Sequence, residues 1–597
     1  MKPLSLVMTG LLLYGCSNDK SEGPSDGGGS DTGSVTGPTY HQDIAPLLST
    51  HCWGCHTEGG MNSETLFDTP ETAQMYAPLL ASMVDSALMP PFYASETDEC
   101  PNDWGWKHDP RMTEEGEALL MEWAANGGPI GDADNPAAIT PPPNTHLVDA
   151  NITVSPSGKF TTSSSEVEAD QFVCLSIDPG LSEAAWLNAF EVVPDNIAVV
   201  HHVLTGIDYS GASADYADAN GVYECFGGFS PPDETIEATF IGGWIPGAGP
   251  IEFPEESALR MPVGSRIVLQ MHYHNTVEPQ EDGTGISLRF SEATPVREAY
   301  ISLYGNEDRQ AADGSGLQPG PNDDGEPRFF VPAEATDHTE TMVIPMNPPI
   351  DRNSQVFLVA NHMHYVGRDM KSSIRHGTNA PDPDTESCLV QTPFWDFDWQ
   401  QFYFYDTSEA APEIWPGDEL ELRCTFDNVS SNPGVARALA DAGLSAPVDV
   451  GLGEGSLDEM CIAVLGQVFE VPLHVETESH TGRSDVTVDI EGLPVQCAGP
   501  VSMKVEVPGE VNVVTACGLD VDSALYTMEM SATGSVSESG SASGTGVISV
   551  MGLSETTTFS WTSTVTDEAL EIPVSATGIF SELSVGINGV LRASKVE

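Results

Sequence analysis

The chain has 597 residues, of which 21 are basic and 90 acidic, so its formal net charge is −69. This length exceeds what one hydrophobic core supports, and about three to five domains are expected. The acidity excludes nucleic acid as a partner, because phosphate binding needs a basic surface. Its simplest interpretation is a soluble, hydrated surface, as in a salty habitat.

The first 16 residues indicate export. Lys2 precedes the apolar run "PLSLVMTGLLLYG", which is too short to span a membrane comfortably. The run ends in "LYGC", which resembles the lipobox of bacterial lipoproteins. The resemblance implies that Cys16 is lipidated, and the alternative is a plain signal peptide cleaved nearby. Residues 17–38 predict a flexible tether. We expect a periplasmic or cell-surface lipoprotein, held by its lipid anchor alone and associated with the outer membrane.

Residues 39–135 form the first expected domain, and "HCWGCH" is its central motif. In a c-type arrangement Cys52 and Cys55 attach the haem and His56 is the proximal iron ligand. A thioredoxin-type dithiol is the alternative, but it needs a βαβ context that is missing. Half a zinc site would need a second ligand pair. The stretch "TEEGEALLMEWAANGGP" predicts a helix capped by Thr113 and ended by Gly127.

The sixth iron ligand is predicted from "ALMPPF", in which two prolines stiffen the loop after Met89. Met83 is a rival in a helix-like stretch. Residues 39–130, including Trp123, resemble single-haem cytochrome c domains. The resemblance implies a small all-α unit with one covalently bound haem c. Methionine ligation would raise the haem potential and suit electron transfer.

The rest of the chain predicts a mainly β protein. Residues 136–147 are a proline-rich linker, after which short apolar alternations are separated by turn residues. This pattern is typical of tandem antiparallel β-sandwiches, jelly-roll-like, at 148–298 and 299–470. Residues 471–597 are expected to form a β-rich domain of unknown role. Its low-complexity "SATGSVSESGSASGTG" predicts a loop or a polar hairpin.

Three histidine pairs fall inside these β-patterned segments, and a methionine precedes a cysteine further on: His201 and His202, His272 and His274, His362 and His364, and Met460. Imidazole binds copper, zinc, nickel and iron, and thioether sulfur prefers Cu(I). Residues i and i+2 of a strand share a face, so His362 and His364 can bind one ion together. The adjacent His201 and His202 can do so only at a strand end or a β-bulge.

The segments "AVVHHVLTG", "LQMHYHN", "VANHMHYVG" and "LDEMC", in this order, resemble the copper type II, ascorbate-dependent monooxygenases, which include the peptidylglycine- and dopamine-hydroxylating enzymes. The resemblance covers about 150–470 and implies two sandwiches with one copper each. It implies an electron-transfer copper at His201, His202 and His272. It implies an oxygen-binding copper at His362, His364 and Met460, and no metal role for His274.

Eleven cysteines are present, and eight remain after Cys16, Cys52 and Cys55. An even number in an oxidising compartment predicts disulfides. Cys497 and Cys517 can pair within the C-terminal domain. The monooxygenase resemblance implies two further pairs, Cys424–Cys461 and Cys174–Cys225, and elimination then leaves Cys100–Cys388.

The sequence also departs from the peptide-amidating enzyme of that family. Ala360 and Val464 stand where that enzyme has an arginine and a tyrosine that help to hold the peptide carboxylate. A peptide ending in glycine is therefore a poor substrate prediction. Arg368 and Tyr365 lie near the predicted copper ligands in sequence, and a structural role is at least as good an interpretation for each.

Together the motifs predict a copper-dependent monooxygenase that hydroxylates a C–H bond of an unknown small organic substrate with O2. The fused haem would relay electrons from an external one-electron donor, ascorbate-like or a redox protein, to the three-histidine copper and then to the other. The alternative is a non-catalytic copper-binding or redox-sensing surface lipoprotein. A structural protein that has lost its metals is a third interpretation, against which the intact ligand set argues.

Overall fold

The computed structural model describes residues 37–595 apart from 59–61, 63–64, 103, 141–145, 165–170, 183, 233, 235, 237, 274–277, 293–294, 296, 324, 347–352, 398, 407–410, 454, 456, 470–478, 491–492, 498–499, 522–523, 551–555, 567–568 and 581–582. The signal segment, Cys16, the tether and His274 therefore lie outside the described residues. No helix in the described part of the chain is long and apolar enough to cross a membrane.

Four helical segments form the N-terminal part: η1 (Tyr40–Ile44), α1 (Ala45–His51), α2 (Pro70–Asp85) and α3 (Glu114–Ala125). They enclose a small core that includes the fully buried Leu48 and Trp123. The Thr113 side chain accepts the N–H of Gly116 at 3.2 Å and caps α3, as predicted. Gly127, with φ +80°, follows the end of that helix. Between α2 and α3 the described residues contain no helix, so the expected domain 39–135 is not helical throughout.

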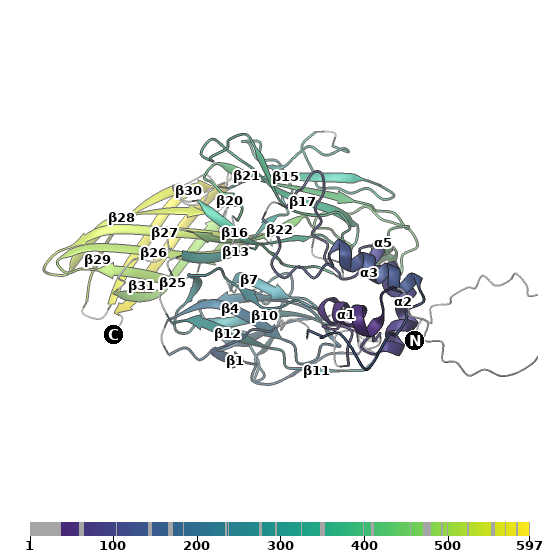
Figure 1. The fold of residues 1–597 in the computed structure, drawn as a ribbon. Helices are drawn as coiled ribbons and strands as arrows, with labels where there is room; N and C mark the ends of the chain where they lie inside the picture. The colour runs from purple at the N-terminus through teal and green to yellow at the C-terminus, as the bar shows by residue number, and fades with distance from the viewer. Residues whose placement is uncertain are drawn as a thin grey trace, which may run out of the picture.

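The middle of the chain is antiparallel β structure in three large sheets (Figure 1). The first five-stranded sheet has the order β6 (Val222–Glu224), β3 (Gln171–Ile177), β10 (Arg266–Tyr273), β5 (Val200–Asp208), β7 (Ala238–Trp244). The second has the order β14 (Gly316–Leu317), β15 (His338–Met346), β21 (Asp418–Phe426), β17 (Gly367–Arg375), β18 (Glu386–Thr392).

A ten-stranded sheet packs against both. Its order is β1 (Ile152–Val154), β12 (Gly285–Ser291), β4 (Ala185–Val193), β9 (Ser257–Met261), β13 (Arg297–Gly305), β22 (Ile462–Phe469), β16 (Ser354–His362), β19 (Tyr403–Phe404). β8 (Ile251–Glu252) pairs with β4 and β20 (Glu413–Ile414) with β16. Smaller elements are the β2 (Phe160–Thr161) and β11 (Glu281–Asp282) pair and the helices α4 (Ser213–Tyr216) and α5 (Pro433–Asp441).

The two expected sandwiches are therefore not separate. β9 and β13 pair in parallel, with Arg297 opposite Ser257, and this pairing joins the two halves into one sheet. The boundary expected at 298/299 falls inside β13. Two cores lie between these sheets, and the first takes in residues of both halves, among them Leu358 and Ala360 of β16 and Val464 of β22.

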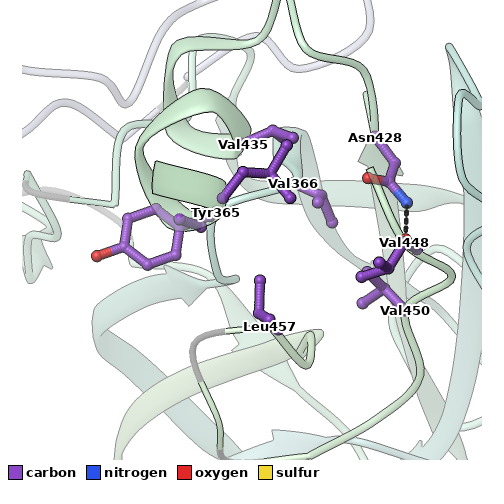
Figure 2. A pocket seen from close by; sticks show the side chains of 9 residues that line it. Tyr365, Val366, Asn428, Val435, Val448, Val450 and Leu457 are labelled. Atoms are coloured by element: carbon purple, nitrogen blue, oxygen red, sulfur yellow. Dashed lines mark hydrogen bonds between the residues drawn. The ribbon is translucent and has the colours of Figure 1, made fainter. Parts of the chain in front are cut away.

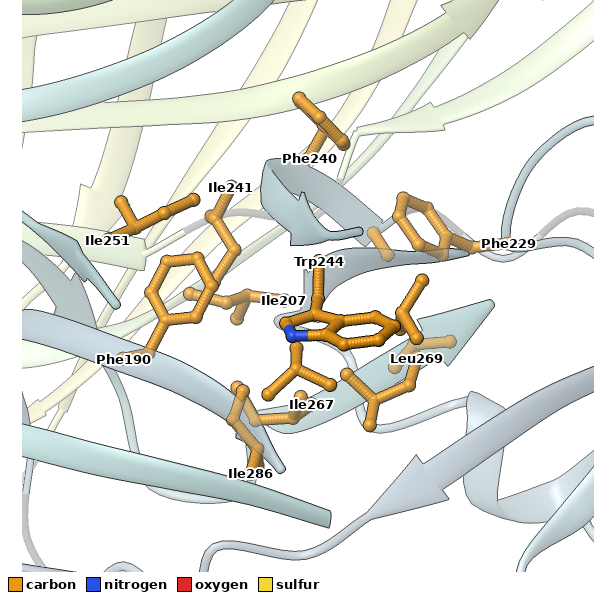
Figure 3. Close-up of a cluster of buried hydrophobic side chains, with 14 of the residues drawn as sticks. Phe190, Ile207, Phe229, Phe240, Ile241, Trp244, Ile251, Ile267, Leu269 and Ile286 are labelled. Carbon is orange, nitrogen blue, oxygen red and sulfur yellow. The ribbon is translucent and has the colours of Figure 1, made fainter. Parts of the chain in front are cut away.

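Each core is filled from both of its sheets. In the first, Figure 3 shows Ile207, Trp244 and Ile267 of the five-stranded sheet facing Phe190 and Ile286 of the ten-stranded sheet. Large side chains of this kind each contribute about 1.5–3 kcal/mol when fully buried. The second core is built in the same way by a group that includes Met342, Ile374, Leu420, Leu422, Val356, Val359 and Leu465.

The C-terminal domain is a nine-stranded sheet with the order β29 (Thr556–Thr564), β28 (Ser541–Val550), β27 (Ala524–Val536), β26 (Gly509–Val521), β25 (Pro500–Val505), β23 (His480–Ile490), β31 (Leu583–Lys595), β30 (Ala569–Phe580), with β24 (Leu493–Cys497) on β23. The low-complexity stretch is the polar hairpin β27–β28. Phe469 and Tyr300 pack with Ala516 and dock this domain on the ten-stranded sheet. It lies at the end of the molecule opposite the N-terminal helices (Figure 1).

Candidate metal centres

The first centre brings together His201, His202 and His272 from two neighbouring strands. β5 and β10 pair antiparallel, with His202 opposite His272 and Val200 opposite Tyr273. His201 is therefore the extra residue of a β-bulge. A regular strand would point adjacent side chains to opposite faces, and the bulge turns both imidazoles to the same side. The sequence-based requirement for a bulge or strand end at this pair is confirmed.

The three imidazole rings face one another with their Nδ1 atoms. The Nδ1 of His272 lies 3.0 Å from that of His201 and 3.3 Å from that of His202. One imidazole nitrogen carries either a hydrogen or a lone pair, so hydrogen bonding cannot satisfy both contacts at once. Nitrogens bound to one ion at about 2 Å are separated by about this distance. Within the described residues this is the one group of three such ligands whose atoms all lie within 4.8 Å of one another.

The surroundings of this centre are rigid. The ring of Phe172, on β3, stacks on His272 with centroids 4.2 Å apart and an interplanar angle of 14°. Two residues along the same strand, Cys174 forms a disulfide with Cys225. His201 and His272 are each 7% exposed. Strand pairing, stacking and the disulfide thus hold three donor atoms around one point before any ion binds.

The second centre lies where β16 ends. His362 is the last residue of that strand, and His364 lies two residues beyond it. His364 therefore lies outside the strand, so the alternation of strand side chains, on which the sequence-based argument relied, does not apply to this pair. Their ring centroids are 5.3 Å apart at 85°. His362 Nδ1 lies 2.7 Å from Gln400 Oε1 and His364 Nδ1 3.1 Å from the Asp458 carbonyl. The Gln400 contact fixes the tautomer of His362 in which Nδ1–H donates and Nε2 carries the lone pair, and the Asp458 contact favours the same tautomer for His364.

Met460 lies two residues before the start of the neighbouring strand, β22. β22 begins at Ile462, which is the partner of His362 across β16 and β22. Met460 is 5% exposed. The preceding residue, Glu459, is completely buried, and its carboxylate accepts the N–H groups of His364, Val366 (3.2 Å) and Met460 (2.8 Å). One side chain thus links the turn after His364 to the segment that carries Met460.

Burial sets the protonation of this centre. It lowers the pKa of His362 to about 3, with a further contribution from the charge of His364. Burial likewise lowers the pKa of His364, against the opposing effect of the Asp458 and Gly455 carbonyls. Both imidazoles are therefore neutral at ordinary pH, which is the form that binds metals. Burial raises the pKa of Glu459 to about 8 in spite of its backbone donors.

Three residues around this centre were not predicted from the sequence, and all lie in the loop 393–402 between β18 and β19. Trp395 Nε1 donates to the His364 carbonyl at 3.0 Å. Phe397 contacts the rings of both His364 and His201, at centroid distances of 5.9 and 6.2 Å. Gln400 is the partner of His362 described above. The one local signal was the density of aromatic residues in "FWDFDWQQFYFY".

The motif "HCWGCH" stands at the end of α1. Cys52 and Cys55 are not in disulfides. His56 Nδ1 lies 2.8 Å from the Thr65 carbonyl, an arrangement that again leaves Nε2 available, and its ring packs on Phe67 at 4.4 Å. Burial, and then the neighbouring Cys55, raise the pKa of Cys52 to about 12, and burial raises the pKa of Cys55. The motif lies between the helices α1 and α2, so the βαβ context of a thioredoxin-type dithiol is not present around it in the described residues.

Met89 lies in the turn after α2 and is 37% exposed. Its N–H donates to the carbonyl of Met83, which is inside α2 as expected. The described contacts of the His56 ring are with Thr65 and Phe67, so no described contact links this ring to either methionine.

Three of the predicted disulfides are formed: Cys100–Cys388, Cys174–Cys225 and Cys424–Cys461. Disulfides indicate an oxidising compartment. Cys497 is also disulfide-bonded, but the side chain of Cys517 lies outside the described part, so that pairing stays a prediction.

Residues near the second centre include those where the sequence departs from the peptide-amidating enzyme. Ala360 and Val464 face each other across β16 and β22 and are both buried, so this position offers no charged or hydroxyl group to a substrate. Arg368 Nη2 forms an ion pair with Asp337 at 2.7 Å, which is a structural contact.

A pocket of about 290 Å³, part of it open solvent, lies between α5 and the turn after His364. Figure 2 shows Val366, Val435 and Leu457 along its wall, with the hydroxyl of Tyr365 directed away from them. The wall is mostly apolar, with Asn428 donating to the Val448 carbonyl at 2.8 Å. Two lining residues are close in sequence to the second centre. Tyr365 follows His364, and Leu457 precedes Glu459 and Met460.

Comparisons with known proteins add little. No protein-family model and no curated protein match the chain. Among solved structures, the VP2 subviral particle of infectious bursal disease virus is similar at a TM-score of 0.10 and 8% identity, with 54% of this chain and 83% of that chain covered. A likeness this weak carries no argument about fold or function.

Proposed function

We propose that the protein is an exported, lipid-anchored, copper-dependent monooxygenase that hydroxylates a C–H bond of a small organic substrate. Lipidation at Cys16 and the tether 17–38 account for the anchor, and the three disulfides are consistent with export. The observation that carries the proposal is the pair of histidine centres, one presenting three Nδ1 atoms and the other two neutral, buried imidazoles whose Nδ1 atoms face oxygen acceptors.

The donor sets fit copper. Three imidazoles suit a first-row divalent ion, and two imidazoles with a thioether suit copper that alternates between oxidation states. His201, His202 and His272 would hold one ion, and His362, His364 and Met460 the other. The second set has fewer imidazoles and so leaves room for a further ligand. When bound, the two coppers would supply one-electron storage and O2 activation, and the haem a one-electron relay.

The residues near the motif "HCWGCH" fit haem. Cys52 and Cys55 stay unpaired in a chain whose other described cysteines are in disulfides, so both thiols can form thioethers. The Thr65 carbonyl orients His56 so that Nε2 is available to iron. Met89 is proposed as the sixth ligand. An ascorbate-like molecule or a redox protein would be the external electron donor.

Oxygen uptake tests the proposal. The copper-loaded, reduced protein is expected to consume O2 in the presence of substrate candidates, and Met460→Ala is expected to consume much less. Both proteins must first show the same haem content and the same free energy of unfolding. Equal rates of oxygen uptake would contradict the catalytic assignment.

The second candidate function is copper binding or redox sensing without turnover. It is favoured by the buried, largely apolar second centre, where Ala360 and Val464 offer no polar contact to a substrate. It predicts two bound coppers and a haem spectrum, but no oxygen uptake coupled to an organic molecule.

A further inference from the structure

A serine, a histidine and an aspartate are linked by hydrogen bonds at one end of three neighbouring strands. Asp418 is the first residue of β21, His376 follows the last residue of β17, and Ser387 is the second residue of β18. The strands are neighbours in the order β21, β17, β18. The histidine, which follows the middle strand, therefore has one partner on each side.

Each contact of His376 uses the ring nitrogen that nucleophilic catalysis by a serine requires. Its Nδ1 lies 2.9 Å from Asp418 Oδ2, and its Nε2 lies 2.8 Å from Ser387 Oγ. A carboxylate only accepts hydrogen bonds, so in the neutral imidazole Nδ1 carries the hydrogen and Nε2 accepts the serine hydroxyl. This is the arrangement of a Ser-His-Asp triad, which is recognised by its geometry and not by the order of its residues in the chain.

The three side chains differ in burial in the way that such a triad needs. The Asp418 side chain is completely buried, the His376 side chain is 12% exposed, and Ser387 is partly exposed. Asp418 also accepts the N–H groups of Gly377 at 2.8 Å and Trp415 at 2.9 Å. The carboxylate that orients the histidine is thus held in place inside the protein, while the serine is accessible from solvent.

The surroundings of Ser387 indicate what it can bind. β18 is the last strand of its sheet, and the outer edge of such a strand has backbone N–H groups without a strand partner. Donors of this kind stabilise the negative oxygen of a tetrahedral intermediate. Asp382, Asp384 and Glu386 precede the serine and are all exposed. Their charge disfavours an anionic substrate, so a neutral one fits better.

This group of residues is separate from both histidine centres. β17 begins three residues after His364 and ends one residue before His376, and its nine residues span about 26 Å. None of the three residues is a proposed metal ligand. A function here is therefore independent of the proposed monooxygenase activity.

We propose that Ser387, His376 and Asp418 form a second active site, which hydrolyses neutral carboxylic esters. Ser387 Oγ attacks the ester carbonyl carbon, and its proton passes to His376 Nε2. The bond from that carbon to the alcohol oxygen breaks, and the alcohol leaves with this proton. Water then attacks the acyl carbon and gives a proton to Nε2, which returns it to Oγ as the acyl bond breaks. One ester and one water give one acid and one alcohol, and Asp418 orients the ring.

Covalent labelling of the full-length protein tests the site without turnover. A fluorophosphonate forms an O–P bond with an activated serine and releases fluoride. Peptide mass spectrometry is expected to find the label on Ser387 in the wild type and to find none there in His376→Gln. Ser315 is the matched control, because it is also partly exposed and its Oγ donates to Asp313, at 2.6 Å, instead of to a histidine. An unlabelled Ser387, or equal labelling of Ser315, overturns the inference.

Ester hydrolysis gives a second measurement, with 4-nitrophenyl acetate as the probe. Ser387→Ala is expected to lower the rate about 100-fold, and Ser315→Ala to leave it unchanged. Both variants should keep the metal content and the oxygen uptake of the wild type, so failure here leaves the proposed function untouched. Equal rates of hydrolysis in the wild type and Ser387→Ala overturn the inference.

Asp418 is a positioning residue and needs its own measurement. In Asp418→Asn the new amide can donate to Nδ1 of His376, so the ring hydrogen is expected to move to Nε2, where it blocks acceptance from the serine. Nitrogen NMR of the His376 ring detects this change, and kcat should fall while KM stays the same. A ring hydrogen that remains on Nδ1, or an unchanged kcat, overturns the role given to Asp418.

Discussion

The carboxylate of Glu459 accepts the backbone N–H of His364, although the two residues are 95 positions apart. The same carboxylate accepts the N–H of Met460, the third proposed ligand of that centre. Backbone N–H groups at a turn have no strand partner and must find an acceptor when buried. Glu459 satisfies them and, in doing so, sets the position of one imidazole relative to the methionine segment.

Replacing Glu459 should therefore destabilise the fold in a graded way. Glu459→Ala leaves three buried N–H groups without their acceptor and is expected to lower the free energy of unfolding by about 3 kcal/mol. Glu459→Gln keeps Oε1, which serves His364 and Met460, and loses only the contact to Val366, for a cost of about 1–2 kcal/mol. Denaturant unfolding of the metal-free protein measures both. Equal losses for Ala and Gln would show that these hydrogen bonds do not matter.

The Cys424–Cys461 disulfide should affect stability and the second centre together. Cys461 follows Met460, and its N–H donates to Asn306 Oδ1 at 3.0 Å. The double substitution Cys424→Ser, Cys461→Ser is expected to lower the free energy of unfolding by about 3–4 kcal/mol, because the bridge constrains the unfolded chain. It should also weaken copper binding at the second centre and leave the first unchanged. Titration of each centre by Cu(II) EPR checks this, and weakening at the first centre alone would contradict it.

Copper stoichiometry tests the three-histidine centre. His272→Ala removes the ring whose Nδ1 faces both neighbours and is expected to reduce bound copper from two ions to one. His146 is the matched control, because its side chain is 81% exposed and pairs with Glu191 on β4, a strand that carries none of the proposed ligands. Elemental analysis after gel filtration is the measurement. A loss of copper in His146→Ala as large as in His272→Ala would mean that the ion binds elsewhere.

Covalent haem attachment distinguishes the two interpretations of the motif "HCWGCH", a haem site and half a zinc site. Cys52→Ser with Cys55→Ser should abolish haem that survives denaturation, because both thioether bonds are lost. Copper content should stay at two ions. If the motif were half a zinc site, the wild type would contain zinc in place of iron, and a pyridine haemochrome spectrum of the wild type would be blank.

Local sequence patterns predicted those features that depend on neighbours in the chain. The cap at Thr113 follows from one side chain and the N–H three residues on. The bulge at His201 follows from strand geometry once two adjacent histidines are required to face the same way. Both are confirmed, because the physics that fixes them acts over a few residues.

The missed features depend on contacts between distant parts of the chain. β9 and β13 meet in parallel through two residue pairs, which is too short a pairing to leave a pattern in the sequence. Residues 91–107 are held on the β structure by aromatic rings and by a disulfide between two cysteines that are 288 positions apart in the chain. Elimination gave the cysteine pair, but nothing in residues 91–107 indicated that the chain leaves the helical module. Gln400 was missed for the same reason, since its partner His362 is on another element.

Phe397 is the residue that most directly tests how the two centres are related. Its ring is half-buried and contacts His201 and His364. Phe397→Ala is expected to cost about 1–3 kcal/mol of stability, less than the about 3–5 kcal/mol of a fully buried phenylalanine. Trp395 and Gln400 still hold the loop to the second centre in this variant, but the ring contact between the loop and His201 is lost. The distribution of distances between the two Cu(II) ions should therefore broaden in pulsed EPR. Phe397→Leu keeps an apolar side chain at this position and should give a distribution close to that of the wild type. An alanine variant with two bound coppers and an unchanged distribution would show that strand pairing alone sets the separation of the centres.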